Sequence, residues 1–323
     1  MLSLLSSGVS FSAQHPIPGC DGESPVVVSA SLNGGEPDPS ATLNATASAQ
    51  LCATLATGLS APTPTCRVVG YTGWRVNGVL VRGHAAADRL LLGVEGLLSP
   101  SQREHIAGVA AGGADARCAA ADDAAAVGAP RDSCQANIVG PDDPHDVHYD
   151  VANDDNGCFG GRGQGQNNCY DYGCDIVTNT FAQPGRGSGQ CSKSSRPCMA
   201  NTCDDVRKGA ESDGLTWVGT ELPTSLPSDG HYVSLHIWPS SNFHWIRTPR
   251  NSCAIPAQFS DAVSIISAGM DANMKWSHKP GGSPVRNHDN DGKEITDPGQ
   301  ANFSPWTEHC GYMLVKPSNA TIY

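Results

Sequence analysis

The stretch HYVSLHIWPSSNFHWIRTP, residues 231–249, is the part of the chain that most directly indicates a fold. Two runs rich in aromatic and β-branched residues flank a Pro-Ser-Ser-Asn segment, which predicts two strands joined by a turn. Because side chains alternate across a strand, we expect His244 and Ile246 on one face and Phe243 and Trp245 on the other.

The histidines of these two strands have two interpretations. A histidine held on a strand between bulky apolar residues suits general-base chemistry, and His244 is the candidate for that role. The alternative is a core histidine that makes one buried hydrogen bond, which is the interpretation we favour for His231 and His236.

Upstream, the stretch GQGQNNCYDYGCDIVTNTFAQPGRG, residues 163–187, predicts a helix of two to three turns that begins at Cys169. Asn167 or Asn168 can cap this helix. A thiol in the first helical turn meets free N–H groups and the positive end of the helix dipole, which lower its pKa. Cys169 is therefore the candidate nucleophile; the alternative is that it forms a disulfide.

The same helix start predicts groups that could hold an oxyanion. Backbone N–H groups near Cys169 are natural donors, and the side chains of Gln164, Gln166 and Asn168 are further candidates for oxyanion binding or positioning.

Farther along this helix, spacing sorts the residues by face. Tyr172 and Ile176 are expected to face the core, and Asp171 and Asp175 the solvent. Cys174 lies on a different helix face from Cys169 and is the better candidate for a disulfide.

A third strand is predicted in MKWSHKPGGSPVRN, residues 274–287. If it pairs with the strand of His244, His278 can hydrogen-bond the His244 ring and hold its tautomer. The order of Cys169, His244 and His278 would then form a Cys-His-His relay.

This order resembles that of papain-like cysteine hydrolases, and FHWIR followed by MKWSHKPGGSPVRN is similar to the NlpC class of cell-wall endopeptidases. The resemblance covers about residues 157–316 and is limited to motifs. It implies that Cys169 is the nucleophile, His244 the base and His278 the orienting partner. The sequence departs from the class in having Asn-Cys-Tyr-Asp around the cysteine and cysteine-containing inserts between the three elements.

Composition divides the rest of the chain. Residues 1–13 resemble a signal peptide without its usual basic residue, and residues 14–65 form a low-complexity lead that Cys20 and Cys52 could pin. Residues 66–130 predict a small mixed region, with a hairpin around Asn77-Gly78 and two helices, the second capped at Ser99. Residues 131–156 form an acidic linker, and residues 157–323 the papain-like domain.

Charge and cysteine content limit the class of protein. The net charge of −12 leaves no basic stripe for nucleic acid, and no apolar run of about 18 residues predicts a membrane span. Thirteen cysteines without close CxxC pairs indicate several disulfides, an oxidising compartment and one thiol left over. Asn44 and Asn319 lie in glycosylation sequons, so we expect a secreted glycoprotein.

Two other motifs are weaker. RNHDNDGKEITDP, residues 286–298, is similar to a calcium loop, but an Asp-Gly turn fits it better because the terminal Glu is absent. Arg186 could anchor a carboxylate, although an exposed loop arginine is the simpler interpretation. We expect no metal and no cofactor.

Together these observations predict an α+β protein in which the helix of Cys169 packs on an antiparallel sheet. The favoured hypothesis is a secreted cysteine hydrolase that cleaves amide or peptide bonds in a peptide or cell-wall-like substrate. The alternative is a non-catalytic, disulfide-rich secreted protein with a binding or structural role.

Overall fold

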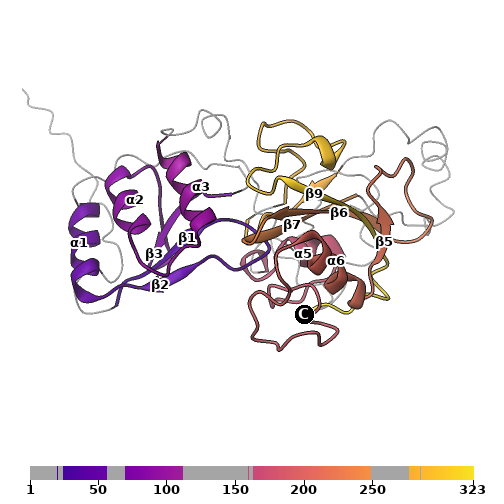
Figure 1. Ribbon diagram of the computed structural model, residues 1–323, viewed down its shortest axis with the longest axis horizontal. Helices are drawn as coiled ribbons and strands as arrows, with labels where there is room; N and C mark the ends of the chain where they lie inside the picture. The colour runs from indigo at the N-terminus through magenta and orange to yellow at the C-terminus, as the bar shows by residue number, and fades with distance from the viewer. Residues whose placement is uncertain are drawn as a thin grey trace, which may run out of the picture.

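The structure is a computed structural model with two lobes, each built on an antiparallel sheet (Figure 1). It describes Cys20, 25–56, 70–111, Phe159, 163–248, 276–283 and 285–323.

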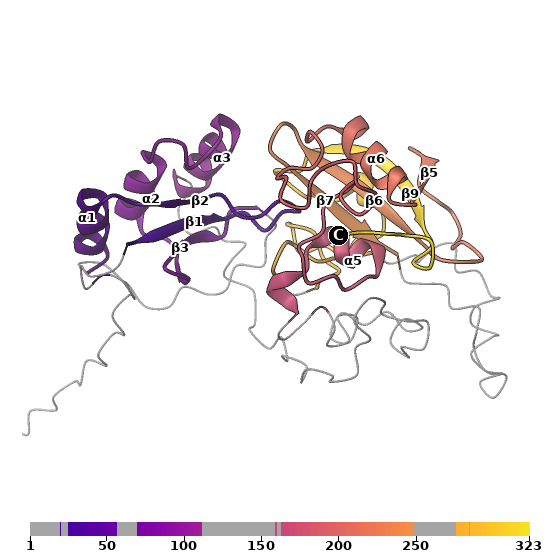
Figure 2. The same ribbon diagram turned by 90° about the horizontal axis from the view of Figure 1, so that it is seen from below.

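The N-terminal lobe is a four-stranded sheet of order β2-β1-β3-β4 with three helices on one side (Figures 1 and 2). Its elements, in chain order, are β1 (Val27–Ser31), β2 (Ser40–Thr42), α1 (Ala45–Ala56), β3 (Gly73–Val76), β4 (Val79–Val81), α2 (Ala85–Leu92) and α3 (Pro100–Ala111).

Local sequence signals account for much of this lobe. Asn77 and Gly78 both have positive φ, 47° and 84°, and form the predicted turn between β3 and β4. The Ser99 Oγ accepts a hydrogen bond from the Gln102 N–H at 3.2 Å, which confirms the predicted cap of α3. Indole and phenol groups converge on the buried Asp88, which accepts hydrogen bonds from Trp74 at 2.9 Å and Tyr71 at 3.1 Å.

The expected low-complexity lead is wrong as a structural unit. Strand β1 comes from the segment 14–65, yet it pairs with β3 from the next segment, so one sheet crosses the predicted boundary. The small residues of the lead form strands because β3 supplies the hydrogen-bonding partner, which composition does not reveal. The Cys20–Cys52 disulfide confirms that these cysteines pin the segment. Residues 1–13 and the linker 131–156 lie outside the described residues.

The C-terminal lobe is a five-stranded sheet of order β5-β9-β6-β7-β8. Its elements are η2 (Gln164–Gln166), α5 (Cys169–Cys174), α6 (Cys203–Ser212), β5 (Thr216–Gly219), β6 (His231–Trp238), β7 (Asn242–Arg247), β8 (Ser277–His278), η5 (Pro298–Gln300) and β9 (Glu308–Val315). The predicted antiparallel pairing of β6 with β7, and of β7 with β8, is confirmed.

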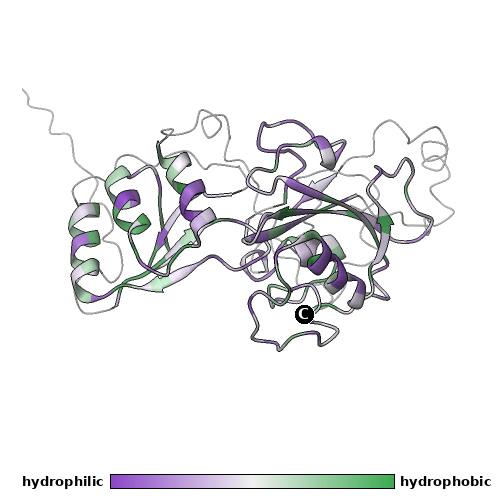
Figure 3. Cartoon of the chain, viewed as in Figure 1, coloured by the Kyte–Doolittle hydropathy of each residue, from purple (hydrophilic) through white to green (hydrophobic). Residues whose placement is uncertain are grey.

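Both faces of this sheet are covered. Helices α5 and α6 pack on one face, against Val233, Leu235, Phe243 and Trp245 among others. The opposite face carries a second hydrophobic cluster that continues into the N-terminal lobe. Between the lobes, the ring centroids of His105 in α3 and Trp238 in β6 lie 5.2 Å apart. In Figure 3 the strands of this sheet carry both hydrophobic and hydrophilic stretches, and α6 carries hydrophilic ones.

Three disulfides join described residues: Cys20–Cys52, Cys191–Cys198 and Cys203–Cys310. The last one ties the start of α6 to β9. Within the described ranges, no helix has the length and apolar character needed to cross a membrane. The predicted α+β class is confirmed at this level.

Candidate functional site

The start of α5 is built by a complete capping box. The Asn168 side chain accepts hydrogen bonds from the N–H groups of Tyr170 and Asp171, and the Asp171 carboxylate accepts one from the Asn168 N–H at 2.8 Å. Cys169 is thus the first residue of the helix, as predicted.

The environment of the Cys169 thiol differs from the expectation. The side chain is fully buried, and its Sγ lies 4.0 Å from the carbonyl oxygen of Phe243. The pKa of this thiol is raised to about 12, mainly by burial and in part by the nearby Asp171, while the Trp245 backbone and Lys279 oppose the rise. The predicted lowering of the pKa is wrong because desolvation outweighs the dipole of a helix only six residues long. The thiol is protonated at neutral pH.

Cys174 is also a free, buried thiol, so its expected role as a disulfide half is wrong. The helix is shorter than predicted because Asp175 adopts a left-handed conformation and ends it. Asp171 and Asp175 are buried, not exposed. Asp171 is used by the cap, and Asp175 forms a 3.0 Å ion pair with the buried Arg247.

The predicted histidine pair exists. The His244 Nε2 and the His278 Nδ1 lie 2.7 Å apart, and the other ring nitrogen of His278 is 3.0 Å from the His288 carbonyl oxygen. Burial lowers the pKa of both rings well below the usual value. The strand pairing therefore brings His278 within hydrogen-bonding distance of His244, as predicted.

The structure does not bring this pair to Cys169. Cys169 packs in the cluster of Phe243 and Trp245, whereas the His244 ring lies against Trp306, with ring centroids 5.4 Å apart, on the opposite face of β7. The two sides of one strand point to opposite faces of the sheet, so the thiol and the imidazole are separated by the sheet itself. The expected Cys-His-His relay is not assembled.

His278 and His244 instead belong to an aromatic layer. The rings of His236, His244 and His278 all lie within 6.0 Å of the Phe303 ring, measured between centroids. His236 also contacts the Ser234 hydroxyl at 3.2 Å, and His231 the Gly173 carbonyl at 2.7 Å, each as predicted for a core histidine.

The candidate oxyanion donors are distributed differently from the prediction. Gln164 donates to the Gly282 carbonyl at 3.2 Å, and Gln166 is exposed. Of the three candidates, Asn168 is the one whose side-chain amide lies beside Cys169. Its Nδ2 donates to the carbonyl oxygens of Gly35 and Ala182, both at 2.8 Å.

The Gly35 carbonyl belongs to the connection between β1 and β2, which extends from the N-terminal lobe to the C-terminal lobe (Figures 1 and 2). We call residues Asn33–Glu36 the strap. A second amide, Gln183 Nε2, donates to the Gly35 oxygen at 2.9 Å, and the Gly35 N–H donates to the Phe243 carbonyl at 2.9 Å. Gln183 and the strap were not predicted as site residues, because both lie in loops without a local motif.

The buried Lys279 was also missed. Its ammonium donates to three carbonyl oxygens, those of Gln164 and Asn167 at 2.6 Å and Gly281 at 2.7 Å. It thereby joins the turn after β8 to the segment before α5, and so supports the helix start from the C-terminal side.

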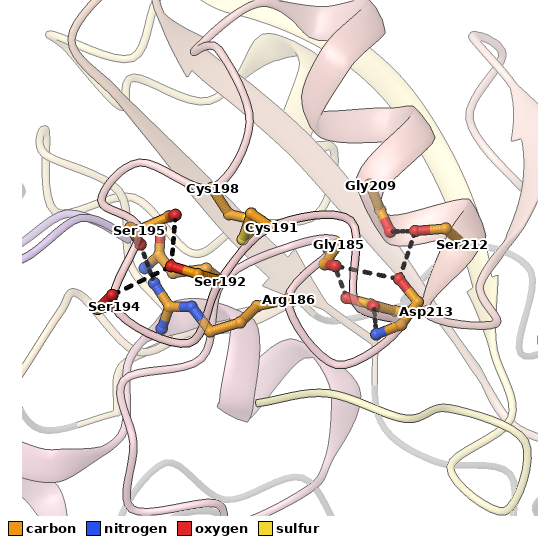
Figure 4. The surroundings of a disulfide bond; sticks show 12 residues. Gly185, Arg186, Cys191, Ser192, Ser194, Ser195, Cys198, Gly209, Ser212 and Asp213 are labelled. Atoms are coloured by element: carbon orange, nitrogen blue, oxygen red, sulfur yellow. Dashed lines mark hydrogen bonds between the residues drawn. A yellow bond between two sulfur atoms is a disulfide. The ribbon is translucent and has the colours of Figure 1, made fainter.

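Arg186 is buried, so the interpretation as an exposed loop arginine is wrong. One guanidinium nitrogen donates to the Ser195 carbonyl at 2.6 Å, inside the loop closed by Cys191–Cys198 (Figure 4). The charge of Arg186 acts on the carboxyl group of Glu36 in the strap, and the alternative role of Arg186 as a carboxylate anchor stays a prediction. Burial raises the pKa of Glu36 to about 7, and Arg186 and Arg196 oppose that rise.

Among the described residues, no group of three or more His, Cys, Asp or Glu side chains is placed to hold a metal ion. The motif similar to a calcium loop forms the tight turn that we favoured. The Asp289 carboxylate accepts hydrogen bonds from the N–H groups of Asp291 and Lys293, both at 2.9 Å, and Gly292 takes a φ of 75°.

Comparison with curated proteins finds a related sequence. The chain is 33% identical over 154 residues to insoluble matrix shell protein 1 of Ruditapes philippinarum, a match that spans 48% of this chain and 82% of the relative. No family model matches the chain. No solved structure matches it either.

Proposed function

Because the chain belongs to the family of insoluble matrix shell protein 1, we propose that it is a secreted, disulfide-bonded structural protein of an extracellular matrix, without catalytic activity. The observation that carries the proposal is the separation of the Cys169 thiol from the His244 ring by the sheet. A thiol nucleophile needs a base within hydrogen-bonding reach, and this thiol is protonated and buried instead.

The disulfides support the extracellular part of the proposal. Such bonds persist in oxidising environments and are rare in reducing ones. Two of the three disulfides between described residues lie in the C-terminal lobe, where they hold the 191–198 loop and attach α6 to β9. A protein that remains in a matrix after secretion benefits from cross-links that keep it folded without renewal.

A cysteine hydrolase of the papain-like type is the second candidate. One observation favours it: two side-chain amides, from Asn168 and Gln183, converge on the carbonyl oxygen of Gly35 beside the Cys169 helix. Paired donors on one carbonyl are typical of an oxyanion site. A catalytic role would require His244 or another base to reach Cys169 by a rearrangement of the sheet and α5.

Alkylation of the native protein separates the two candidates. We expect iodoacetamide at pH 7.5 to leave Cys169 unmodified until urea unfolds the chain, because the thiol is buried and protonated. Modification of Cys169 in the native state, together with amidase activity that is lost in Cys169→Ala and kept in the matched variant Cys174→Ala, would contradict the structural role.

Fractionation tests the matrix location directly. Extracellular material from the producing tissue is separated into buffer-soluble and insoluble parts, and peptides of this chain are measured by mass spectrometry. We expect enrichment in the insoluble part. Recovery from the cell interior, with Cys203 and Cys310 reduced, would refute the proposal.

A further inference from the structure

The strap occupies a defined position on the C-terminal lobe although it belongs to the N-terminal lobe (Figure 2). Its residues Asn33, Gly34 and Gly35 are buried, and its contacts come from the starts of α5 and β7, the Gln183–Arg186 segment and the turn after β8. Polar groups that are complementary to a peptide backbone surround it on these sides.

We propose that this surface of the C-terminal lobe is a peptide-binding site specific for a Gly-Gly-Glu sequence in the bent conformation of the strap, and that the strap is its intramolecular ligand. The proposal goes beyond the matrix role, because it concerns what the lobe recognises and not where the protein resides.

The C-terminal lobe binds the backbone of the strap through hydrogen bonds. The Gly35 N–H donates to the Phe243 carbonyl at 2.9 Å, and the Gly35 oxygen accepts from Asn168 and Gln183. The next N–H, that of Glu36, donates to the Asn242 Oδ1 at 2.9 Å. Two successive N–H groups and the carbonyl between them are thus bound by the lobe, which is how a peptide is held independently of its side chains.

The space around Gly34 and Gly35 admits glycine but no larger residue. A Cβ on Gly34 would overlap the Asn242 side chain, and a Cβ on Gly35 would overlap the Phe243 ring. Neither glycine lies in the left-handed region, so close approach and not backbone conformation excludes a side chain here. Phe243 is buried between the sheet and α5, so its ring has little room to move away.

Positive charges near Glu36 favour an acidic side chain at this position of the strap. The Glu36 side chain enters a region where Arg186 and Arg196 provide the neighbouring positive charges. The hydrogen bond from the Arg186 guanidinium to the Ser195 carbonyl, within the disulfide loop of Figure 4, holds that arginine in place. A cation at the Glu36 position would meet both arginines and be repelled.

The far end of the strap is anchored as well. The Ser283 hydroxyl donates to Asn33 Oδ1 at 2.9 Å, so the turn after β8 contacts the residue before the two glycines. Because a tethered segment acts at an effective concentration in the millimolar range, a free peptide can enter only after the strap is displaced.

The test uses the full chain with Gly35→Val, which places branched carbons against the Phe243 ring and should displace the strap. The matched control is Gly108→Val, where an added Cβ meets no atom within 4 Å. The probe is a fluorescent peptide with the sequence of residues 31–39, SLNGGEPDP. We expect its affinity, measured by fluorescence anisotropy, to be at least tenfold higher for Gly35→Val than for the wild type or Gly108→Val.

Two competitor peptides test specificity. SLNGVEPDP and SLNGGKPDP should each compete at least tenfold more weakly than the parent peptide. Equal competition by either one would overturn the assigned specificity. No probe binding by a Gly35→Val chain that melts cooperatively would overturn the site itself.

If Gly35→Val does not fold, hydrogen exchange of the wild type gives the answer. Excess SLNGGEPDP, at about 10 mM to exceed the effective concentration of the tether, should accelerate exchange at the amides of Gly35 and Glu36. SLNGVEPDP should not. Unchanged exchange with both peptides would refute the proposal, and neither result depends on whether the protein is found in a matrix.

Discussion

The Cys203–Cys310 disulfide should contribute more to stability than the Cys191–Cys198 disulfide in the same lobe. The first closes a loop of 107 residues and the second a loop of 7. A cross-link stabilises mainly by restricting the unfolded chain, and the loop-closure relation gives about 4.8 kcal/mol for the long loop and about 2.4 kcal/mol for the short one. The predicted difference is therefore about 2.4 kcal/mol.

The assay is urea unfolding at pH 7 of two paired variants, Cys203→Ala/Cys310→Ala and Cys191→Ala/Cys198→Ala. Each removes two sulfurs, so the short-loop pair is the control for the substitution itself. We expect the free energy of unfolding to be highest for the wild type, lower for the short-loop variant and lowest for the long-loop variant. If the long-loop variant is as stable as the short-loop variant, the attachment of α6 to β9 is maintained by packing alone and the argument from chain entropy is refuted.

Two further predictions concern charge in the C-terminal lobe. Asp175→Asn should cost about 3–5 kcal/mol in the free energy of unfolding, because it leaves the buried Arg247 without its 3.0 Å ion-pair partner; a loss below 1 kcal/mol by the same urea assay would contradict this. Burial holds the pKa values of His236, His244 and His278 well below their values in the unfolded chain. Below about pH 6.5 the unfolded chain therefore binds more protons than the folded one, and the free energy of unfolding decreases as the pH is lowered. On going from pH 7.5 to pH 5.5, the free energy of unfolding of His236→Gln should therefore decrease by about 1.4 kcal/mol less than that of the wild type. An equal decrease in both proteins would count against a buried neutral ring at His236.

Features with a short-range cause were predictable from the sequence. The cap of α5 depends on Asn168 and Asp171, three residues apart, and the turn between β3 and β4 on the pair Asn77-Gly78. The strand of His278 was predicted from strand pattern and turn residues, and its pairing with β7 was the condition for a contact with His244. This pairing places His278 beside His244 as expected.

Features that depend on distant partners were not predictable. Asp175 looks exposed from helix spacing, yet it is buried because Arg247 lies against it from β7. The two glycines of the strap look like part of a low-complexity lead. Their role depends on Phe243 and Asn242, about two hundred residues later in the chain.

The structure does not bring the residues of the predicted relay together, for a reason that lies in β7 itself. The alternation along FHWIR was predicted correctly, with His244 and Ile246 on one face and Phe243 and Trp245 on the other. All six residues of β7 are buried, so both faces of the strand are equally suited to be covered by a helix. A strand that is buried on both sides does not specify which face α5 will cover, and that choice determines whether the thiol meets the imidazole. The order of cysteine and histidine in a sequence therefore predicts a catalytic pair only when one face of the histidine's strand is polar enough to exclude the helix.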